Sequence, residues 1–303
     1  MTPPVVLVWL VVCLLWSSTF AFIRLGLEHI PPFTFAWLRL AVAAAVLVPM
    51  AVGGGHWRSL SGRDVAAMCV TGVLLLGVNY GLVFWGAQFV PSGLVAILLA
   101  GTPVVALGFG WVLGSEGVNA RKLLALTLGL FGVIVIFGAQ ARAAGGAALL
   151  GAIAVFGASV CVAFAYVWLK THGHHLSPTA VTALQSIAGL LPLAALGLII
   201  EGTPTFVHWP ATAWMALVYL ALIASVLAFW LNYWLLQRMD ASAMLMMGVA
   251  EVPIAVALGA LIFDERLPAG TLVGGMCVLA GVVAGLTGKP VAPRGHPKRW
   301  SSE

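Results

Sequence analysis

Charged residues are scarce in this chain of 303 residues, in which 14 basic and 9 acidic residues together make up only 8 %. A soluble protein carries about 25 % charged residues. Hydrophobic residues make up 62 % of the chain, and its mean hydropathy is +1.10. They fall in runs of roughly 20 residues, the length that crosses the hydrocarbon core of a bilayer. The composition excludes an ordinary soluble protein and predicts an integral membrane protein.

Cysteine is scarce too, and the 4 cysteines stand inside apolar runs without a second cysteine or a histidine at ligand spacing. We therefore expect neither a disulfide framework nor a metal site. His172, His174 and His175 fall in a short predicted loop without a fourth ligand, which favours a solvated loop over a metal centre. No cofactor-binding motif stands out. The net charge of +5 reflects a basic C-terminal tail that suits a cytoplasmic anchor, so no nucleic-acid partner is expected.

Apolar runs bounded by charge, glycine or proline predict ten membrane spans. Their limits are 5–27, 32–52, 65–88, 91–113, 122–140, 148–170, 178–200, 211–237, 241–263 and 269–288. With a cytoplasmic N-terminus, the inner loops and the tail hold ten basic residues and the outer loops three, Arg24, Arg142 and Arg266. This positive-inside bias predicts that both termini are cytoplasmic.

An internal repeat relates residues 81–138 to residues 230–288. Six identical pairs keep nearly the same offset: Trp85 and Trp234, Gln88 and Gln237, Ser92 and Ser242, Pro103 and Pro253, Glu116 and Glu265, and Gly132 and Gly281. Five spans in each half make the second half inverted, which is a recurrent design of secondary transporters. We predict an all-α membrane protein with a first five-helix repeat (1–147), a second, inverted repeat (148–288) and a basic cytoplasmic tail (289–303).

The segment 14–49 resembles the opening of the EamA family in the drug/metabolite transporter superfamily. It has a tryptophan near the middle of the first span, a proline before the second span, and Arg39 within that span. A proline followed about a dozen residues later by a glutamate, in both halves, is similar to the endings of the family's helices 4 and 9. Two departures are Ser17, where the family has glycine, and the separation of Glu251 from Pro253 by one residue.

The resemblance implies an alternating-access secondary transporter in the bacterial inner (plasma) membrane that exports small metabolites, foremost aromatic or other hydrophobic amino acids. Paired aromatic residues favour the YddG-type aromatic amino acid exporters within the family. The alternatives are export of another metabolite or drug class and, from other classes, an intramembrane enzyme or a channel. An enzyme needs converging carboxylates or histidines, and a channel needs rings of polar residues; neither pattern is visible. A coupling proton and the oligomeric state are left open.

Two charged residues, Arg39 and Glu251, stand well inside predicted spans, where a charge costs about 2.5–3.5 kcal/mol on insertion scales. The resemblance favours a structural or gating role for Arg39, through hydrogen bonds to neighbouring carbonyl groups. Glu251 binds a substrate ammonium group or a proton, or else pairs with Arg39. The sequence leaves both alternatives open.

Further candidates come from the third and eighth spans, whose aromatic residues occupy equivalent positions of the repeat. Aromatic residues at helical spacing often only pack, but equivalent positions of inverted repeats can meet near the midplane, where substrates bind. The candidate substrate-binding residues are Asn79, Tyr80, Phe84, Trp85, Tyr166, Phe229, Trp230, Tyr233 and Glu251. The candidate structural or gating residues are Arg39, Gln88, Pro103, Gln237 and Pro253.

Two further sequence features concern packing. Glu116 and Glu265 end the fourth and ninth spans, and we expect them to cap neighbouring helices or to pair with Arg121 and Arg266. Glycines at 77 and 81, 270 and 274, and 281 and 285 form small-xxx-small pairs, which predict close helix approach.

Overall fold

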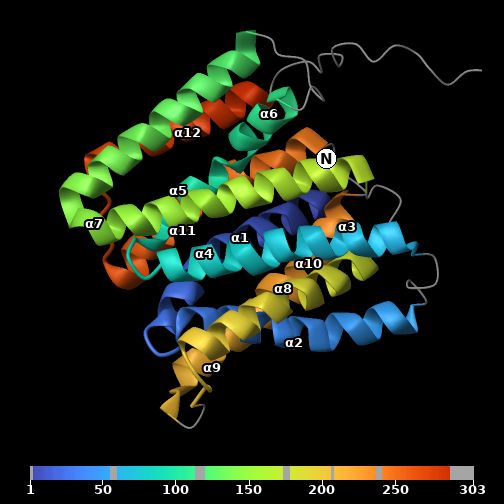
Figure 1. Cartoon of the computed structure of the whole chain (residues 1–303). Coiled ribbons are helices and arrows are strands. Elements are labelled where there is room, and N and C mark those ends of the chain that lie inside the picture. The colour runs from blue at the N-terminus through green and yellow to red at the C-terminus, as the bar shows by residue number, and fades with distance from the viewer. Residues whose placement is uncertain are drawn as a thin grey trace, which may run out of the picture.

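The structure is a computed structural model that describes residues 3–54, 60–112, 120–172, 178–205, 208–236 and 241–286. These residues form helices and short connections, without a strand. In chain order the helices are α1 (Pro3–Leu27), α2 (Pro32–Gly53), α3 (Gly62–Gly72), η1 (Val73–Val78), α4 (Asn79–Gly86), α5 (Ser92–Ala100), α6 (Thr102–Val112), α7 (Ala120–His172), α8 (Pro178–Ile200), α9 (Ala211–Val218), η3 (Tyr219–Leu227), α10 (Ala228–Leu236), α11 (Ala241–Phe263) and α12 (Ala269–Leu286). They pack side by side in one bundle (Figure 1).

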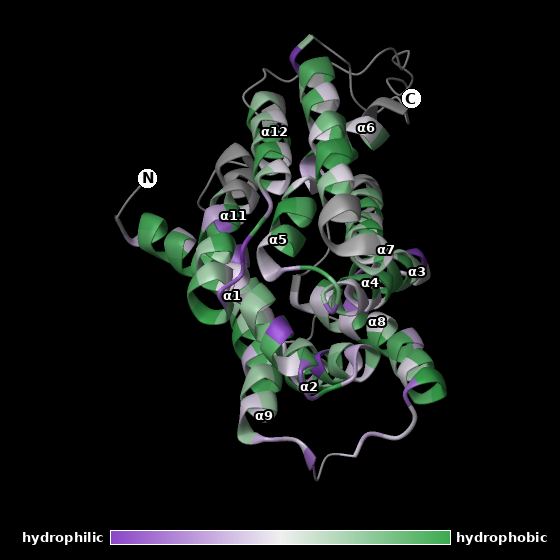
Figure 2. Cartoon of the chain, turned by 90° about the vertical axis from the view of Figure 1, so that its left-hand side faces the viewer, coloured by the Kyte–Doolittle hydropathy of each residue, from purple (hydrophilic) through white to green (hydrophobic). Residues whose placement is uncertain are grey.

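The described part of the chain contains 6 helices that are long and apolar enough to cross a membrane, together with four shorter apolar helices. Many large apolar side chains point outward: Leu261 is 83 %, Ile199 81 % and Ile134 68 % exposed. Figure 2 shows hydrophobic residues over the outer faces of the helices and hydrophilic ones mainly on the connections. Such a surface is stable in lipid and not in water, so the chain is a multi-pass membrane protein.

Two predicted spans, 122–140 and 148–170, belong to the single helix α7. Phe137 and Phe156 pack edge to face in it, with 5.8 Å between ring centroids. In a straight helix they would lie about 28 Å apart, so α7 folds back on itself, as the sharp bend in Figure 1 shows. α7 reverses between Leu123–Ala139 and Gly146–Ala165, where the sequence predicts the connection of two spans. Its first arm precedes the bend and its second arm follows it.

The third and eighth predicted spans each contain a π-helical segment that interrupts the α-helix. Residues 62–86 form the consecutive elements α3, η1 and α4, and residues 211–236 form α9, η3 and α10 in the same way. The middle segment of each, η1 and η3, is a π-helix, a wider turn that is rare and frequently found at functional sites. Interruptions at equivalent places agree with the internal repeat.

The fourth predicted span is broken between α5 and α6 at Gly101. Pro103 has no N–H and cannot continue the hydrogen bonds of α5, so it stands at the start of α6. The Thr102 hydroxyl donates to the Leu99 carbonyl oxygen at 2.6 Å, and the Ser159 hydroxyl donates to that of Leu98 at 2.9 Å. These two hydroxyls add to the backbone hydrogen bond that Gly101 donates to the Leu98 carbonyl oxygen at 3.3 Å. The equivalent Pro253 instead lies inside the uninterrupted helix α11.

Helices of the two halves interleave through close glycine contacts. A Cβ atom added to Gly132 on the first arm of α7 would lie 2.5 Å from the Gly274 carbonyl oxygen on α12, and one on Gly274 would lie 2.7 Å from that of Gly132. A Cβ on Gly189 of α8 would lie 2.8 Å from the backbone nitrogen of Gly77. Any residue other than glycine would bring its Cβ atom into collision with the neighbouring backbone at these distances. The predicted close approach is confirmed at Gly77 and Gly274, and both contacts join one half to the other.

Candidate functional site

Arg39 is the best-defined charged group inside the bundle. It stands on α2, is 4 % exposed, and its Nε donates a hydrogen bond to the Ser225 Oγ atom of η3 at 3.1 Å. Its guanidinium carbon lies 4.6 Å from the centroid of the Tyr80 ring on α4, a cation–π contact. Arg39 thus connects α2 to the two interrupted spans. The expected hydrogen bonds from Arg39 to backbone carbonyl groups are not observed among the described residues.

Ser225 continues the contact from Arg39 into the backbone of η3. The Ser225 hydroxyl donates to the Leu220 carbonyl oxygen, five residues back, at 2.9 Å. Because arginine has donors and no acceptor, Arg39 is the donor and Ser225 the acceptor of the bond between them. A donor–acceptor chain therefore runs from Arg39 through Ser225 to the backbone.

A second polar contact joins α1 to η3. Tyr219 stacks on Phe22 with ring centroids 3.8 Å apart, and its hydroxyl oxygen lies 2.6 Å from the Ser18 hydroxyl oxygen. Since Ser18 donates to the Leu15 carbonyl group at 2.9 Å, the Tyr219 hydroxyl is the donor. The two hydroxyls thus form a polar contact between α1 and the interrupted eighth span.

Glu251 stands on α11 in a different setting. It is partly buried and close enough to Cys13 of α1 to interact electrostatically with the thiol. Trp9 and Trp16 of α1 and Trp234 of α10 are partly buried around the neighbouring apolar cluster. Among the described residues Glu251 has no ion pair and no hydrogen bond from its carboxylate. The alternative in which it pairs with Arg39 is therefore not observed.

The depth of these groups follows from their places along the helices. We call the end of the bundle that holds the connection between α1 and α2 the α1–α2 end; it lies at the left of Figure 1. At about 1.5 Å per residue, Cys13, Ser225 and Glu251 lie about 18–21 Å from this end. The hydrocarbon core is about 30 Å thick. Ser225 and Glu251 are therefore at mid-membrane depth, and Arg39 reaches that depth through its bond to Ser225.

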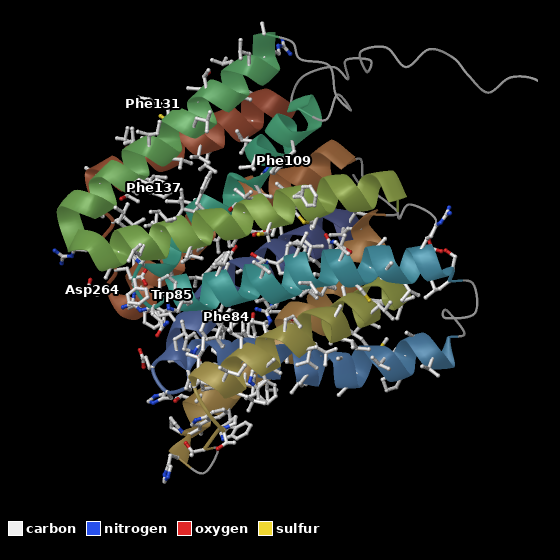
Figure 3. All side chains as sticks on the ribbon, viewed as in Figure 1. Phe84, Trp85, Phe109, Phe131, Phe137 and Asp264 are labelled. Carbon is white, nitrogen blue, oxygen red and sulfur yellow. The ribbon has the colours of Figure 1, made fainter. Side chains whose placement is uncertain are left out.

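Three aromatic candidates lie away from this depth or outside any polar setting. Phe84 is fully buried and packs edge to face on Phe35, with 5.2 Å between centroids. Trp85 packs on Phe89 at the α1–α2 end, and Figure 3 shows it beside that end while Phe84 lies further in. Trp230 is 59 % exposed. The roles of Phe84, Trp85 and Trp230 in substrate binding stay predictions.

Other candidates have varied settings. Gln88 is exposed beyond the end of α4 and donates to the Trp85 carbonyl group at 3.1 Å. The Asn79 amide nitrogen donates to the Leu75 carbonyl group at 2.9 Å, while its buried Oδ1 has no partner among the described residues. Phe229 packs edge to face on Trp16, with centroids 6.2 Å apart. Gln237 lies outside the described residues, as do the side chains of Tyr166 and Tyr233.

Glu265 is the centre of a cluster at the α1–α2 end that we call the end cluster, formed by Glu265, Arg24 and Ser92. The backbone nitrogen and hydroxyl of Ser92, the first residue of α5, donate to Glu265 at 3.0 and 2.9 Å, and the Gly93 nitrogen donates at 3.4 Å. Arg24 of α1 forms an ion pair with the same carboxylate. The predicted capping role of Glu265 is confirmed, but its partner is Arg24 and not Arg266. Glu116 lies outside the described residues.

Sequence reasoning missed two features of this end. Glu201 follows α8 and accepts hydrogen bonds from the backbone nitrogens of Phe33 and Thr34 at 2.8 and 2.6 Å, which caps α2. Gly259 of α11 leaves the room that the end cluster needs, because a Cβ atom there would lie 2.5 Å from the Glu265 Oε2. The sequence signal that could have identified Glu201 is its position directly after an apolar span.

The described residues hold no group of three or more histidine, cysteine or acidic residues that could bind a metal ion. His172 ends α7, and His174 and His175 lie outside the described residues.

Comparisons with known proteins agree on one family. The model of the EamA-like transporter family matches residues 3–138 and again 149–286. The chain is 26 % identical over 272 residues to the uncharacterized transporter YoaV of Bacillus subtilis, covering 89 % of this chain and 92 % of the relative. It is 25 % identical over 294 residues to the probable amino-acid metabolite efflux pump of Escherichia coli, covering 92 % and 93 %. The uncharacterized inner membrane transporter YedA of E. coli is 27 % identical over 263 residues, covering 84 % and 81 %.

One solved crystal structure has the same fold. It aligns with a TM-score of 0.61 at 18 % identity, covering 94 % of this chain and 96 % of that chain. An identity this low shows the fold alone.

Proposed function

The chain belongs to the EamA-like transporter family, and from this membership we propose that it is an alternating-access secondary transporter that exports amino acids and related compounds. Aromatic and other hydrophobic amino acids are the proposed substrates, and the bacterial inner membrane is the proposed location. The relative named a probable amino-acid metabolite efflux pump and the one named an inner membrane transporter support both parts.

The observation that carries the proposal is the setting of Glu251. A carboxylate at mid-membrane depth is costly and marks a substrate or ion pathway by default. Glu251 lies without an ion partner among the described residues, next to Cys13 and near a cluster with Trp9, Trp16 and Trp234 at its edge. A carboxylate beside aromatic side chains suits a molecule that joins an ammonium group to an apolar group. Hydrophobic amino acids have this combination.

The packing of the two halves supports alternating access. The second and seventh spans, α2 and α8, contact each other, and so do the first arm of α7 and α12. In each pair, one helix is the repeat-equivalent of the other. Inverted halves that pack in this way can exchange conformations, which opens a central site to either side in turn.

Topology is part of the proposal: ten spans, two inverted repeats at 1–147 and 148–288, and both termini in the cytoplasm. The test is a pair of reporter fusions at the C-terminus. Green fluorescent protein should fluoresce there, and alkaline phosphatase should stay inactive. An active phosphatase would place the C-terminus outside and overturn the proposed orientation.

Counterflow into liposomes that contain the purified protein tests the function. Vesicles preloaded with one unlabelled amino acid should take up the labelled one faster than empty vesicles do, and uptake should saturate. Stimulation by a different metabolite class, and by no amino acid, would assign the alternative cargo. Uptake without saturation would indicate a channel, and a chemically altered product would indicate an enzyme. Collapse of a proton gradient separates proton antiport from simple facilitation.

A further inference from the structure

The terminal nitrogens of Arg39 are the feature that the proposed function leaves unexplained. A guanidinium has five N–H donors, and Arg39 uses the one on Nε, toward Ser225. Within the described residues its two terminal nitrogens have no hydrogen-bond partner, and they are not among the fully buried atoms that lack one, although the residue as a whole is only 4 % exposed. Four N–H donors of Arg39 are therefore open to a further acceptor.

No counter-charge for Arg39 comes from the described part of the chain. Glu251 does not pair with it, and the other described acidic residues stand at helix ends or in connections: Glu28, Asp64, Glu201, Asp264 and Glu265. Arg39 has no ion pair among the described residues. The negative charge that neutralises it is therefore expected from a bound molecule.

The orientation of the guanidinium is fixed before any ligand arrives. Ser225 accepts the hydrogen bond from Nε and donates its own proton to the Leu220 carbonyl oxygen. The Tyr80 ring lies 4.6 Å from the guanidinium carbon and supports it through a cation–π contact. With Nε occupied, the edge that remains carries both terminal nitrogens. Two parallel N–H groups on one edge match the two oxygens of a carboxylate.

We propose that Arg39 binds the carboxylate group of the substrate through its two terminal nitrogens, and that Ser225 and Tyr80 are positioning residues for it. This inference rests on the proposed function and narrows it: the transporter takes carboxylate-bearing substrates and discriminates against their amides and amines. Arg39 is then part of the binding site and not a packing residue.

Binding to the purified protein in detergent tests this independently of export. The probes are phenylacetate, a carboxylate without an ammonium group, and phenylacetamide, its neutral isostere. Thermal denaturation should show stabilisation by phenylacetate at millimolar concentration and none by phenylacetamide. The difference should vanish in Arg39→Gln and persist in Arg63→Gln, which removes an exposed arginine. Equal stabilisation by both probes, or by neither, overturns the proposal.

Flux measurements give the second readout. In counterflow with the best amino acid found for the wild type, the acid should be preferred over its amide by about a hundredfold, as expected for a desolvated charge pair. Arg39→Gln should abolish this preference because it lowers the acid flux far more than the amide flux. Equal loss of acid and amide flux would show a structural role and overturn the proposal. Absence of amino acid flux in the wild type would overturn the proposed function, while phenylacetate binding still decides the role of Arg39.

Two milder variants keep the test valid if Arg39→Gln fails to fold. Arg39→Lys keeps the charge but not the two-nitrogen edge, and Ser225→Ala frees Nε. Each should lower the acid-to-amide preference by about tenfold, because a bidentate contact becomes a weaker one. An unchanged preference in both variants, with normal gel-filtration profiles, would remove Arg39 from the binding site.

Discussion

Arginine and glutamate occur both in the end cluster and at mid-membrane depth, but within the described ranges they form an ion pair only in the end cluster. In the end cluster, the Glu265 carboxylate accepts hydrogen bonds from Ser92 and Gly93 and pairs with Arg24. At mid-membrane depth, Arg39 and Glu251 share neither an ion pair nor a hydrogen bond in the part of the chain that the structure describes. Charges in the end cluster pair with each other, whereas the two charges at depth have no ion pair among the described residues, as their proposed roles in binding require.

Helix geometry accounts for this difference. The first four N–H groups of a helix have no partner within it, so a carboxylate near the start of α5 finds donors without any special arrangement. In the middle of a helix the backbone groups are already bonded to each other. A charge there must find a side chain of suitable depth and rotation, or a ligand. The comparison teaches that depth, and not residue type, separates structural charges from candidate binding charges here.

Removal of a charge at mid-membrane depth should have the largest effect on transport. Glu251→Gln is expected to lower the export of a hydrophobic amino acid by about a hundredfold, because it removes the proposed partner of the ammonium group at low dielectric. Counterflow in liposomes measures it. The matched control is Glu28→Gln, which neutralises an exposed carboxylate beyond the end of α1 and should leave flux unchanged. Full activity of the Glu251 variant would show that this charge is not used.

Breaking the end cluster should affect stability more than transport. Glu265→Gln is expected to lower the stability by about 2–3 kcal/mol through the loss of charged hydrogen bonds to the start of α5. Arg24 is 38 % exposed and adds little, since water screens an exposed partner. Thermal denaturation in detergent reports the change.

Asp264→Asn is the control for that measurement. Asp264 is exposed, and its φ of 51° suits asparagine as well as aspartate. This variant should keep the wild-type melting temperature. If it were destabilised as much as Glu265→Gln, negative charge in the connection would matter more than capping.

The aromatic support of Arg39 should have a smaller effect. Tyr80→Ala is expected to raise the KM for a carboxylate substrate by about three- to thirtyfold, the range of a cation–π contact of 0.5–2 kcal/mol. Tyr80→Phe keeps the ring and should stay within about twofold of the wild type. Similar losses in both variants would point to the Tyr80 hydroxyl as the important group.

The smallest effect is expected from Trp230→Ala. Trp230 lies on α10 and is 59 % exposed, and we expect lipid and not substrate to be its neighbour. Flux should remain within about twofold, as for surface substitutions. A loss as large as that of Glu251→Gln would show that this surface takes part in transport and would remove the distinction between inward and outward faces.

Helix positions and close contacts of the two halves could be predicted from the sequence because they depend on local patterns. Apolar runs identified helices, and the small-xxx-small pairs identified Gly77 and Gly274 as contact points. The capping role of Glu265 was also predicted, since a helix start always needs acceptors. The reversal of α7 was predicted too, as the connection between two spans. The high exposure of Trp230 was not predicted, because the repeat relates positions along the chain and not the neighbours of each side chain.

The sequence by itself determined that this is a helical membrane protein with two related halves and two charges at depth, since composition and periodicity act within each helix. Only the tertiary structure decided which groups meet: Glu265 with Arg24 and not Arg266, and Arg39 with Ser225 and Tyr80 but not Glu251. Such partners depend on the depth and rotation of one helix against another. Packing sets both, at contacts such as Gly132 with Gly274 that lie far apart in the chain.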